Sequence, residues 1–569
     1  MRLRRVLVPS FSALVIASAC SVDNRDPSVN QDMRGLEGGS GDGQGGSEPT
    51  QVVDAAGADG GPPPSSGMGG SASQLGSSGS SGSSGSGSGH VGASGSGNEP
   101  TACDPTAFPA SDACVISEDF GVFVAPTGDD SIADGSRASP FGTLARAAQV
   151  AHDRGRSVYA CATGGAFAEL LQLGPTLAGL QLFGGFSCDD WSYDVQLAAH
   201  LDSPFPSALE LDGISAVRFE NFQFTSSAAV AAGASSIAAR IVDSQNVSFV
   251  RSAFVSGTGA PGLSGQNGAP GANGVTSGGP RRGPDADCAA ALIEDGPPGA
   301  SNACGSIAGN GGGTVPPPNP RGFFGGSGAP GAQNGGVPSE GLSDNGGNGG
   351  NGVAGASGAN GALSPSIGSF SATGYAPPTA AAGGAGQTGQ GGGGGAAGNA
   401  PDETDFCRQA LGGAGGLGGC AGQGGSGGQG GGASVALLSW NSQVSLTACQ
   451  LTASAGGRGG NGGDGGNGGT GEAGAPGGAG TIIEGDLLES LSGDGGNGGR
   501  GGDGGTAGGG AGAAGGPSIG MASQGSPPVL LNGSAIQVQS GGLGGQGGQG
   551  GSGRAANGPQ GQAMSSLTQ

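Results

Sequence analysis

Glycine falls at every third residue in several long runs of this 569-residue chain. The longest run extends from Gly456 to Gly480, and others lie at 259–274, 346–361, 413–431, 496–508 and 541–553. Three residues per turn is the repeat of the left-handed polyproline-II helix, which has no internal hydrogen bonds. Such helices bond to neighbours or remain solvated, so the period predicts surface architecture rather than an active site.

The composition limits the size of any conventional core and the class of partner. Glycine supplies 139 residues, aromatic residues make up 4% and charged residues 11%. Gly-Gly-X brings almost no side chain to bury, so most of the chain cannot form an ordinary core. The chain has 42 acidic and 19 basic residues, a net charge of −23, and every basic residue is an arginine. Nucleic-acid binding needs a basic surface, so we expect no nucleic-acid partner.

The N-terminus has the pattern of an export signal. Three arginines precede a short apolar segment at 6–16, and Ala17-Ser18-Ala19 then precedes Cys20. The apolar segment is too short for a permanent membrane span, which predicts a signal peptide over 1–19. Small residues before a cysteine resemble a bacterial lipobox, which implies a lipid on Cys20 and an exported protein of the outer membrane or cell surface. Because Ala17 replaces the usual leucine, ordinary signal cleavage remains the alternative.

Export makes disulfides feasible. Residues 20–100 are rich in Ser, Gly and Pro and predict a lipidated, disordered tether. Cys449 lies in an apolar segment and is expected as a buried thiol. The other cysteines suggest four short-range pairs: Cys103 with Cys114, Cys161 with Cys188, Cys288 with Cys304, and Cys407 with Cys420.

Order is expected from about residue 101. Short strands are predicted at 121–124, 157–161 and 179–183, with Gly184-Gly185-Phe186 as a turn. A helix is predicted to open at Ser139-Pro140, with Phe141 on its apolar face, and to end at Gly155.

A nine-residue pattern with alternating apolar positions then recurs. Its copies lie at 216–224, 246–254 and 443–451, with a weaker one at 528–536. Val217 and Val247 are 30 residues apart, near one coil of a β-solenoid, whereas Val444 follows Val247 by 197 residues and Val529 follows Val444 by 85. The added length is glycine-rich, so the glycine runs are expected as insertions between coils of one solenoid.

Two resemblances follow from these motifs. Residues 122–130 and 138–144 resemble the N-terminal region of right-handed parallel β-helix proteins of the pectate-lyase-like superfamily, and Gly184-Gly185-Phe186 followed by Trp191 is similar to secreted bacterial members. The glycine runs resemble the Gly-Gly-X (PGRS-like) repeats of mycobacterial surface proteins and glycine-rich antifreeze bundles. The resemblance implies an all-β fold, a right-handed parallel β-helix with inserted polyproline-II-like or polyglycine-II-like arms.

The expected organisation divides the chain into consecutive parts. After the signal peptide and the tether come the N-terminal β-helix with a capping helix (101–256), arm one (257–432), a rung (433–455), arm two (456–518), the last rung (519–540) and a glycine-rich tail (541–569). Arm two is predicted to run out over 456–480 and to return over 496–508. Whether the arms are ordered stays open, because glycine loses the most backbone entropy on ordering.

The chemistry that the resemblance implies has little support in the residues. Polysaccharide lyases of this superfamily use a basic side chain and an acidic Ca²⁺ site. The chain has no lysine, and Arg218 and Arg251 are expected to face solvent. Asp129, Asp130 and Asp134 share a glycine-containing loop that suggests Ca²⁺ binding, with an acidic turn-forming loop as the alternative. No other cofactor is expected.

The sequence therefore favours a non-enzymatic, cell-surface-anchored structural or adhesive lipoprotein. Its N-terminal lipid would hold it to the membrane, and its partners would be surface glycans or matrix. The alternative is a polysaccharide-binding or polysaccharide-degrading β-helix protein with a Ca²⁺ site.

Overall fold

The computed structural model describes residues 103–104, 106–287, 294–314, 321–400, 408–480, 482–483 and 490–569. Residues 97–569 form one compact unit. The expected signal peptide, Cys20 and the tether lie outside the described residues. Within the described part, no helix has the length and hydrophobicity that crossing a membrane requires.

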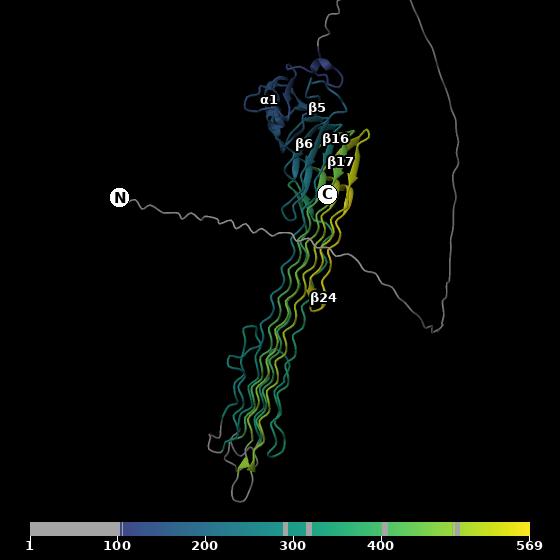
Figure 1. Cartoon of the computed structure of the whole chain (residues 1–569). Helices are drawn as coiled ribbons and strands as arrows, with labels where there is room; N and C mark the ends of the chain where they lie inside the picture. The colour runs from purple at the N-terminus through teal and green to yellow at the C-terminus, as the bar shows by residue number, and fades with distance from the viewer. Residues whose placement is uncertain are drawn as a thin grey trace, which may run out of the picture. The chain divides into compact units, whose positions relative to one another are not determined.

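Three parallel sheets form the body of this unit (Figure 1). Sheet A contains, in spatial order, β1 (Gly121–Val124), β2 (Ser157–Cys161), β5 (Gln181–Phe186), β8 (Arg218–Glu220), β11 (Val247–Val250), β16 (Val444–Thr447) and β21 (Val529–Leu531). Sheet B contains β3 (Ala166–Phe167), β6 (Ala199–Ser203), β9 (Phe222–Ser226), β12 (Ala253–Val255), β17 (Gln450–Ala453) and β22 (Ala535–Val538). Sheet C contains β4 (Leu171–Leu173), β7 (Ser207–Asp212), β10 (Ser236–Val242), β15 (Ser434–Trp440), β20 (Ser518–Gln524) and β25 (Ala563–Thr568).

From β2 onward the chain visits the sheets in the repeating order A, B, C. Each strand pairs in parallel with the equivalent strand one coil later, for example Val247 with Val444 and Ser236 with Ser434. This is the topology of a parallel β-solenoid, as the 30-residue repeat indicates. The right-handed winding stays a prediction.

The solenoid core is a stack of apolar side chains from equivalent positions. Phe249 pairs with Phe219 on one side and Leu446 on the other. The rings of Phe219 and Phe249 stack with centroids 5.3 Å apart, and those of Phe224 and Phe254 stack at 5.4 Å. All four phenylalanines are fully buried. Alternating apolar residues thus form the inner face of each strand, as half-buried strands require.

Helix α1 (Leu144–Arg154) packs against the first strands and starts later than predicted. Thr143 is its N-cap, and Gly155 ends it with a φ of 63°. Phe141 instead forms a bridge with Val124, because the segment before the helix lies along β1. Two short 3₁₀ turns, Ala113–Val115 and Pro175–Leu177, complete the helical elements of the described residues.

Two local predictions were wrong. The predicted turn at Gly184-Gly185-Phe186 is part of β5, where a Cβ at Gly184 would lie 2.3 Å from the carbonyl oxygen of Asn221. The last coil is also shifted by one residue in sheet A, where Val529 pairs with Ser445 rather than Val444. The cause is Gly533, an additional turn residue with a φ of 81° that restores the expected register by β22.

Glycine-rich arms leave the coil after β12, β17 and β22 and return at β15, β20 and β25 (Figure 1). We call the segments 257–432, 456–517 and 541–562 arms one, two and three. Three short antiparallel pairs lie within them: β13 (Ser369–Ser371) with β14 (Gly374–Ala376), β18 (Ile482–Ile483) with β19 (Ser490–Leu491), and β23 (Gln549–Gly550) with β24 (Gly553–Arg554). The expected C-terminal tail is therefore wrong: it folds as arm three and the closing strand β25, whose Met564 and Leu567 pack on the outer face of sheet C.

Backbone hydrogen bonds join the arm segments at every third residue. The N–H groups of Gly259 and Gly262 donate to the carbonyls of Ala455 and Arg458, and the same offset of 196 residues persists to Gly274. Outgoing segments are thus parallel to one another and continue the register of sheet B. Within arm two, the outgoing segment 457–478 and the returning segment 495–516 are antiparallel and are joined by backbone hydrogen bonds. Arm two is therefore the predicted hairpin.

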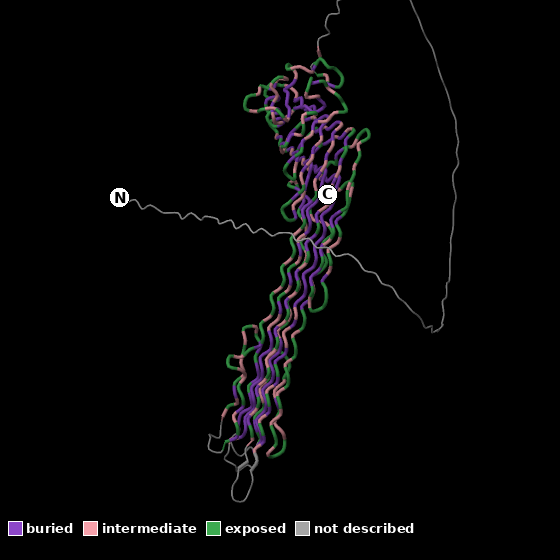
Figure 2. The backbone as a smooth tube through the Cα atoms, in the orientation of Figure 1, coloured by how far each residue is buried: buried purple, intermediate pink, exposed green. Residues whose placement is uncertain are grey.

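Buried positions run along the length of the bundle (Figure 2) and are mostly glycine and alanine, with a few larger side chains such as Leu411 and Leu417. A Cβ at Gly393 or Gly394 would lie 1.8 Å from a carbonyl oxygen of a neighbouring segment. Real Cβ atoms essentially never approach closer than 3.0 Å. Glycine at these positions is therefore required by the spacing between segments.

Asparagine and aspartate at the third repeat position add a second set of bonds. The Oδ1 atoms of Asn345, Asn348 and Asn351 accept from the backbone N–H groups of Asp494, Asn497 and Arg500 at 2.7, 2.7 and 2.9 Å. The sequence analysis missed this function, although the recurrence of Asn and Asp every third residue is visible in the sequence.

Candidate functional site

The outer face of sheet A carries a buried aromatic cluster at its N-terminal half. Phe123, Tyr159, Phe183, Phe186 and Trp191 form it, with ring centroids 4.8 to 6.4 Å apart in the contacting pairs. The Tyr159 hydroxyl donates to the Val115 carbonyl at 2.7 Å and so ties the N-terminal segment onto the sheet.

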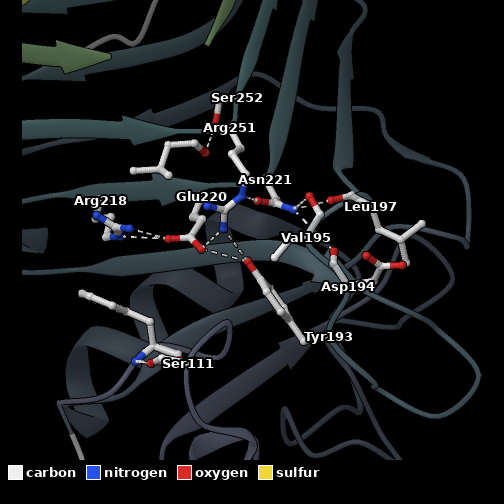
Figure 3. A network of polar contacts seen from close by, with 12 residues as sticks. Ser111, Tyr193, Asp194, Val195, Leu197, Arg218, Glu220, Asn221, Arg251 and Ser252 are labelled. Carbon is white, nitrogen blue, oxygen red and sulfur yellow. Dashed lines mark hydrogen bonds and ion pairs between the residues drawn. The ribbon is translucent and has the colours of Figure 1, made fainter. Parts of the chain in front are cut away.

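A charged network centred on Glu220 continues this face (Figure 3). Glu220 ends β8, and its side chain is only 2% exposed. It accepts from Arg218 Nε at 3.2 Å and Nη2 at 2.5 Å, from the Tyr193 hydroxyl at 2.9 Å and from Arg251 Nη2. Both arginines were expected to face solvent; their side chains are instead partly covered, at 25% and 33% exposed, because the buried carboxylate between them holds each guanidinium against the sheet.

Stacked turns position the second half of the Glu220 network. Asn221 and Arg251 occupy the same left-handed turn one coil apart, with φ values of 59° and 48°. Arg251 Nε donates to Asn221 Oδ1 at 2.9 Å, and Asn221 Nδ2 donates to the carbonyls of Val195 and Leu197 at 2.8 and 2.6 Å. The network thereby fastens the loop around Tyr193 to the solenoid.

The Glu220 network has the properties of a structural clamp. All four donors point at one carboxylate that solvent barely reaches, so Glu220 is poorly placed to take a proton from a substrate. Removing one partner from such a buried charge network is strongly destabilising, because it leaves the remaining charge uncompensated. The sequence signal was the polar Arg-x-Glu on an otherwise apolar repeat strand.

Replacing Glu220 by glutamine should lower the free energy of unfolding by about 3 kcal/mol. The amide nitrogen would face two guanidinium groups and leave them without their counter-charge. Urea denaturation measures the loss. Glu118→Gln is the control, since its pair with Arg137 is long, 3.9 Å, and exposed, and should be worth less than about 1 kcal/mol. Equal losses in the two variants would contradict the clamp.

All three tyrosines of the chain are buried or half-buried and resist ionisation. Burial raises the pKa of Tyr159 to about 12, and burial also raises the pKa values of Tyr193 and Tyr375. For Tyr193 the Glu220 carboxylate adds to the rise in pKa.

We expect the folded protein to show much less tyrosinate absorbance at pH 10 than the unfolded chain, in which tyrosine is half-ionised at that pH. The unfolded state then binds fewer protons than the folded state. Stability is therefore fully present below pH 10 and declines as pH rises from 10 toward 12. A spectrophotometric titration with parallel circular dichroism tests this, and tyrosinate formation near pH 10 with the fold intact would refute it.

A pocket of about 380 Å³ lies between the end of α1, the segment 106–120 and the first strands of sheet A. Its polar lining includes Asp119, His152, Arg156 and Gln181. The volume falls in the range of small-molecule sites. Nowhere in the described ranges do three or more His, Cys, Asp or Glu side chains form a group that could hold a metal ion.

The three aspartates of the suggested Ca²⁺ loop accept hydrogen bonds from their own loop and from the start of α1. Asp129 accepts from Ser131, and Asp134 accepts from the backbone N–H of Ser136. Asp130 points elsewhere, toward Thr143 and the start of α1. Hydrogen bonds from Ser131 and Ser136 lower the pKa values of Asp129 and Asp134. The acidic residues thus form turns and a helix start, as the alternative interpretation stated.

The disulfides agree with the sequence only in part. Cys103–Cys114 and Cys161–Cys188 form as expected. Cys304 pairs with Cys420, so the expected pairs of Cys304 with Cys288 and of Cys407 with Cys420 are wrong; Cys288 and Cys407 lie outside the described residues. The reason is packing, because the segment around Cys304 lies beside the returning part of arm one, where Asn302 Nδ2 donates to the Gly418 carbonyl at 2.9 Å.

Cys449 is a buried free thiol, as expected. It lies at the turn between β16 and β17, and its sulfur is 3.5 Å from the Phe249 carbonyl oxygen. Burial raises the pKa of this thiol, which keeps it protonated and unreactive at neutral pH.

No protein-family model and no curated protein matches the chain. Solved structures similar to part of it include a pectin methylesterase from Aspergillus niger in penultimately deglycosylated form, with 14% identity, 24% of this chain and 44% of that chain covered, and a TM-score of 0.18. A rhamnogalacturonan lyase has 16% identity, coverages of 26% and 39%, and a TM-score of 0.18. The chain thus spans less than half the length of either enzyme. No activity follows from a likeness at this level. The assignment of the parallel sheets depends on the strand pairing of this chain and not on these structures.

Proposed function

We propose that this chain is a non-enzymatic structural or adhesive protein of the bacterial cell surface. In this proposal the lipid on Cys20 holds it to the outer membrane, the segment to residue 100 is a tether, and a right-handed β-helix carries stiff polyproline-II-like arms. The partners would be surface glycans or matrix.

The observation that carries the proposal is the register between solenoid and arms. The parallel pairing of β12 with β17 continues into the backbone hydrogen bonds at every third residue of arms one and two. Each arm is therefore an extension of the coil from which it leaves. A bundle crosslinked in this way resists bending. Disulfides, which persist in oxidising compartments, support export.

The outward positions of the arms supply the contact surface. Leu263, Val275 and Val353 are 63%, 70% and 66% exposed along the repeat, among polar and small residues. Such rows suit weak, repeated contacts with an extended partner. Among the described residues, Glu220 is the carboxylate that pairs with two arginines, and its side chain is enclosed. This enclosure favours binding rather than catalysis as the function of the protein.

Deletion of arm one tests the proposal. The Ser256 and Ser434 hydroxyls that flank it are 2.8 Å apart, so a short linker can join β12 to β15. Cells displaying the deleted protein should lose adhesion to matrix while the solenoid keeps its β circular dichroism. Retained adhesion would contradict the arm's function, and cleavage or saturable Ca²⁺-dependent binding of an acidic polysaccharide would favour the alternative.

The anchor has a separate test. Cys20→Ala should abolish incorporation of labelled fatty acid and release the protein into the medium, whereas Ser21→Ala should leave it membrane-bound. Labelling of the Cys20→Ala variant would refute the lipid site.

A further inference from the structure

The two ends of the solenoid differ in how they are closed. At the first end, α1 packs Leu144, Ala147, Ala148 and Ala151 into the core. At the other end, β21, β22 and β25 are the last strands of sheets A, B and C. Within the part of the chain that the structure describes, each of these three strands pairs on one side only.

The open end leaves core positions partly uncovered. Leu530, Ile536 and Val538 pack against the core but are only partly buried, whereas Leu446 and Leu451 one coil earlier are fully buried. Beside them, Val529 and Leu531 are 54% and 45% exposed. The last coil therefore presents apolar side chains together with three rows of unpaired backbone groups.

The same end lacks the charge that covers the rest of the protein. None of the 42 acidic residues follows Asp503, and Arg554 is the one charged side chain after it. The strands β21, β22 and β25 contain no charged residue and no proline. Edge strands normally carry such residues because they prevent pairing with another edge.

We propose that this open end binds the same end of a second copy, edge to edge, about a two-fold axis. A two-fold contact must be self-complementary; with the axis at β22, this edge pairs antiparallel with its own copy, and β21 faces β25 of the second copy in antiparallel orientation. The remaining surface belongs to a chain of net charge −23 and repels its own copy, whereas the three end strands contain no charged side chain. Contact would also cover Leu530, Ile536 and Val538.

Sedimentation velocity of the full chain in mild detergent, over a range of concentrations, tests the proposal. Gln537 on β22 and Gln450 on β17 are both exposed, but only Gln537 lies on the open edge. We expect a dimer whose Kd rises roughly tenfold or more with Gln537→Glu, because two like charges then face each other. Gln450→Glu adds the same charge one coil away and should leave the Kd within about twofold.

Hydrogen exchange locates the contact. Amides of 529–538 and 563–568 should slow on dimerisation in the wild type and not in Gln537→Glu. Both variants should keep the wild-type circular dichroism spectrum, since both positions are exposed. A chain that stays monomeric, a dimer that both substitutions weaken equally, or protection confined to the arms would overturn the proposal.

Discussion

Replacing Gly383, Gly386 and Gly389 together by alanine should disorder the middle of arm one. Their new Cβ atoms would lie 2.0, 2.1 and 2.2 Å from the carbonyl oxygens of the returning segment of arm two. Backbone atoms cannot rotate away as a side chain can, so the segments must separate. Overpacking typically costs about 1–3 kcal/mol per site, which gives about 3–9 kcal/mol for the three.

Gly384→Ala is the matched control from the same segment. Its Cβ would have its nearest contact, Ala359 N, at 3.4 Å, which is ordinary van der Waals contact. The substitution restricts the unfolded chain, so stability should stay equal or rise by up to about 1 kcal/mol. Amide exchange over 380–398 and calorimetry measure both effects. Equal exchange in the triple variant and the control would mean that the arms do not pack as described.

Removing the Cys304–Cys420 disulfide should destabilise arm one by about 4–5 kcal/mol, because this crosslink closes a loop of 116 residues in the unfolded chain. The Cys304→Ser/Cys420→Ser variant should show faster amide exchange in the returning segment and an earlier thermal transition. Cys103→Ser/Cys114→Ser is the comparison, since its separation of 11 residues predicts a smaller loss of about 3 kcal/mol.

Peptide mapping without reduction gives an independent check of the pairing. A fragment that joins Cys304 to Cys420 is expected in the wild type. A fragment that joins Cys304 to Cys288 would restore the pairing inferred from sequence proximity, and the difference in stability between the two double variants should then shrink.

The solenoid strands were predictable where the alternation of apolar and polar residues within one coil is enough to identify the strand. The bounds of β1 and β2 agree with the prediction, because alternation of apolar residues over four or five positions is a local signal. Gly184 and Gly185 were misread as a turn, because the glycines are needed for close approach of Asn221 and Asp194, which lie in later parts of the chain. Sequence alone gives no information about such neighbours.

The candidate site was less predictable than the fold. Arg218, Glu220 and Arg251 each look like ordinary outward residues of a repeat strand, and only the covering loop with Tyr193 turns them into a buried network. The pairing of Cys304 with Cys420 likewise depends on which arm segments are neighbours. The glycine period indicated that the helices form hydrogen bonds with neighbouring segments, but not which segments are neighbours. The register of the solenoid strands determines which arm segments pair.

The continuity of register between coils and arms also sets a rule for how such a protein can change in length. Adding one residue to an arm segment would place later non-glycine residues at glycine positions, where a Cβ would in most cases lie closer than 3.0 Å to a neighbouring backbone. Adding three residues going out and three coming back preserves the phase and extends the reach by about 9 Å. Insertions and deletions in the arms should therefore survive as matched triplets, so that arm length varies in fixed steps.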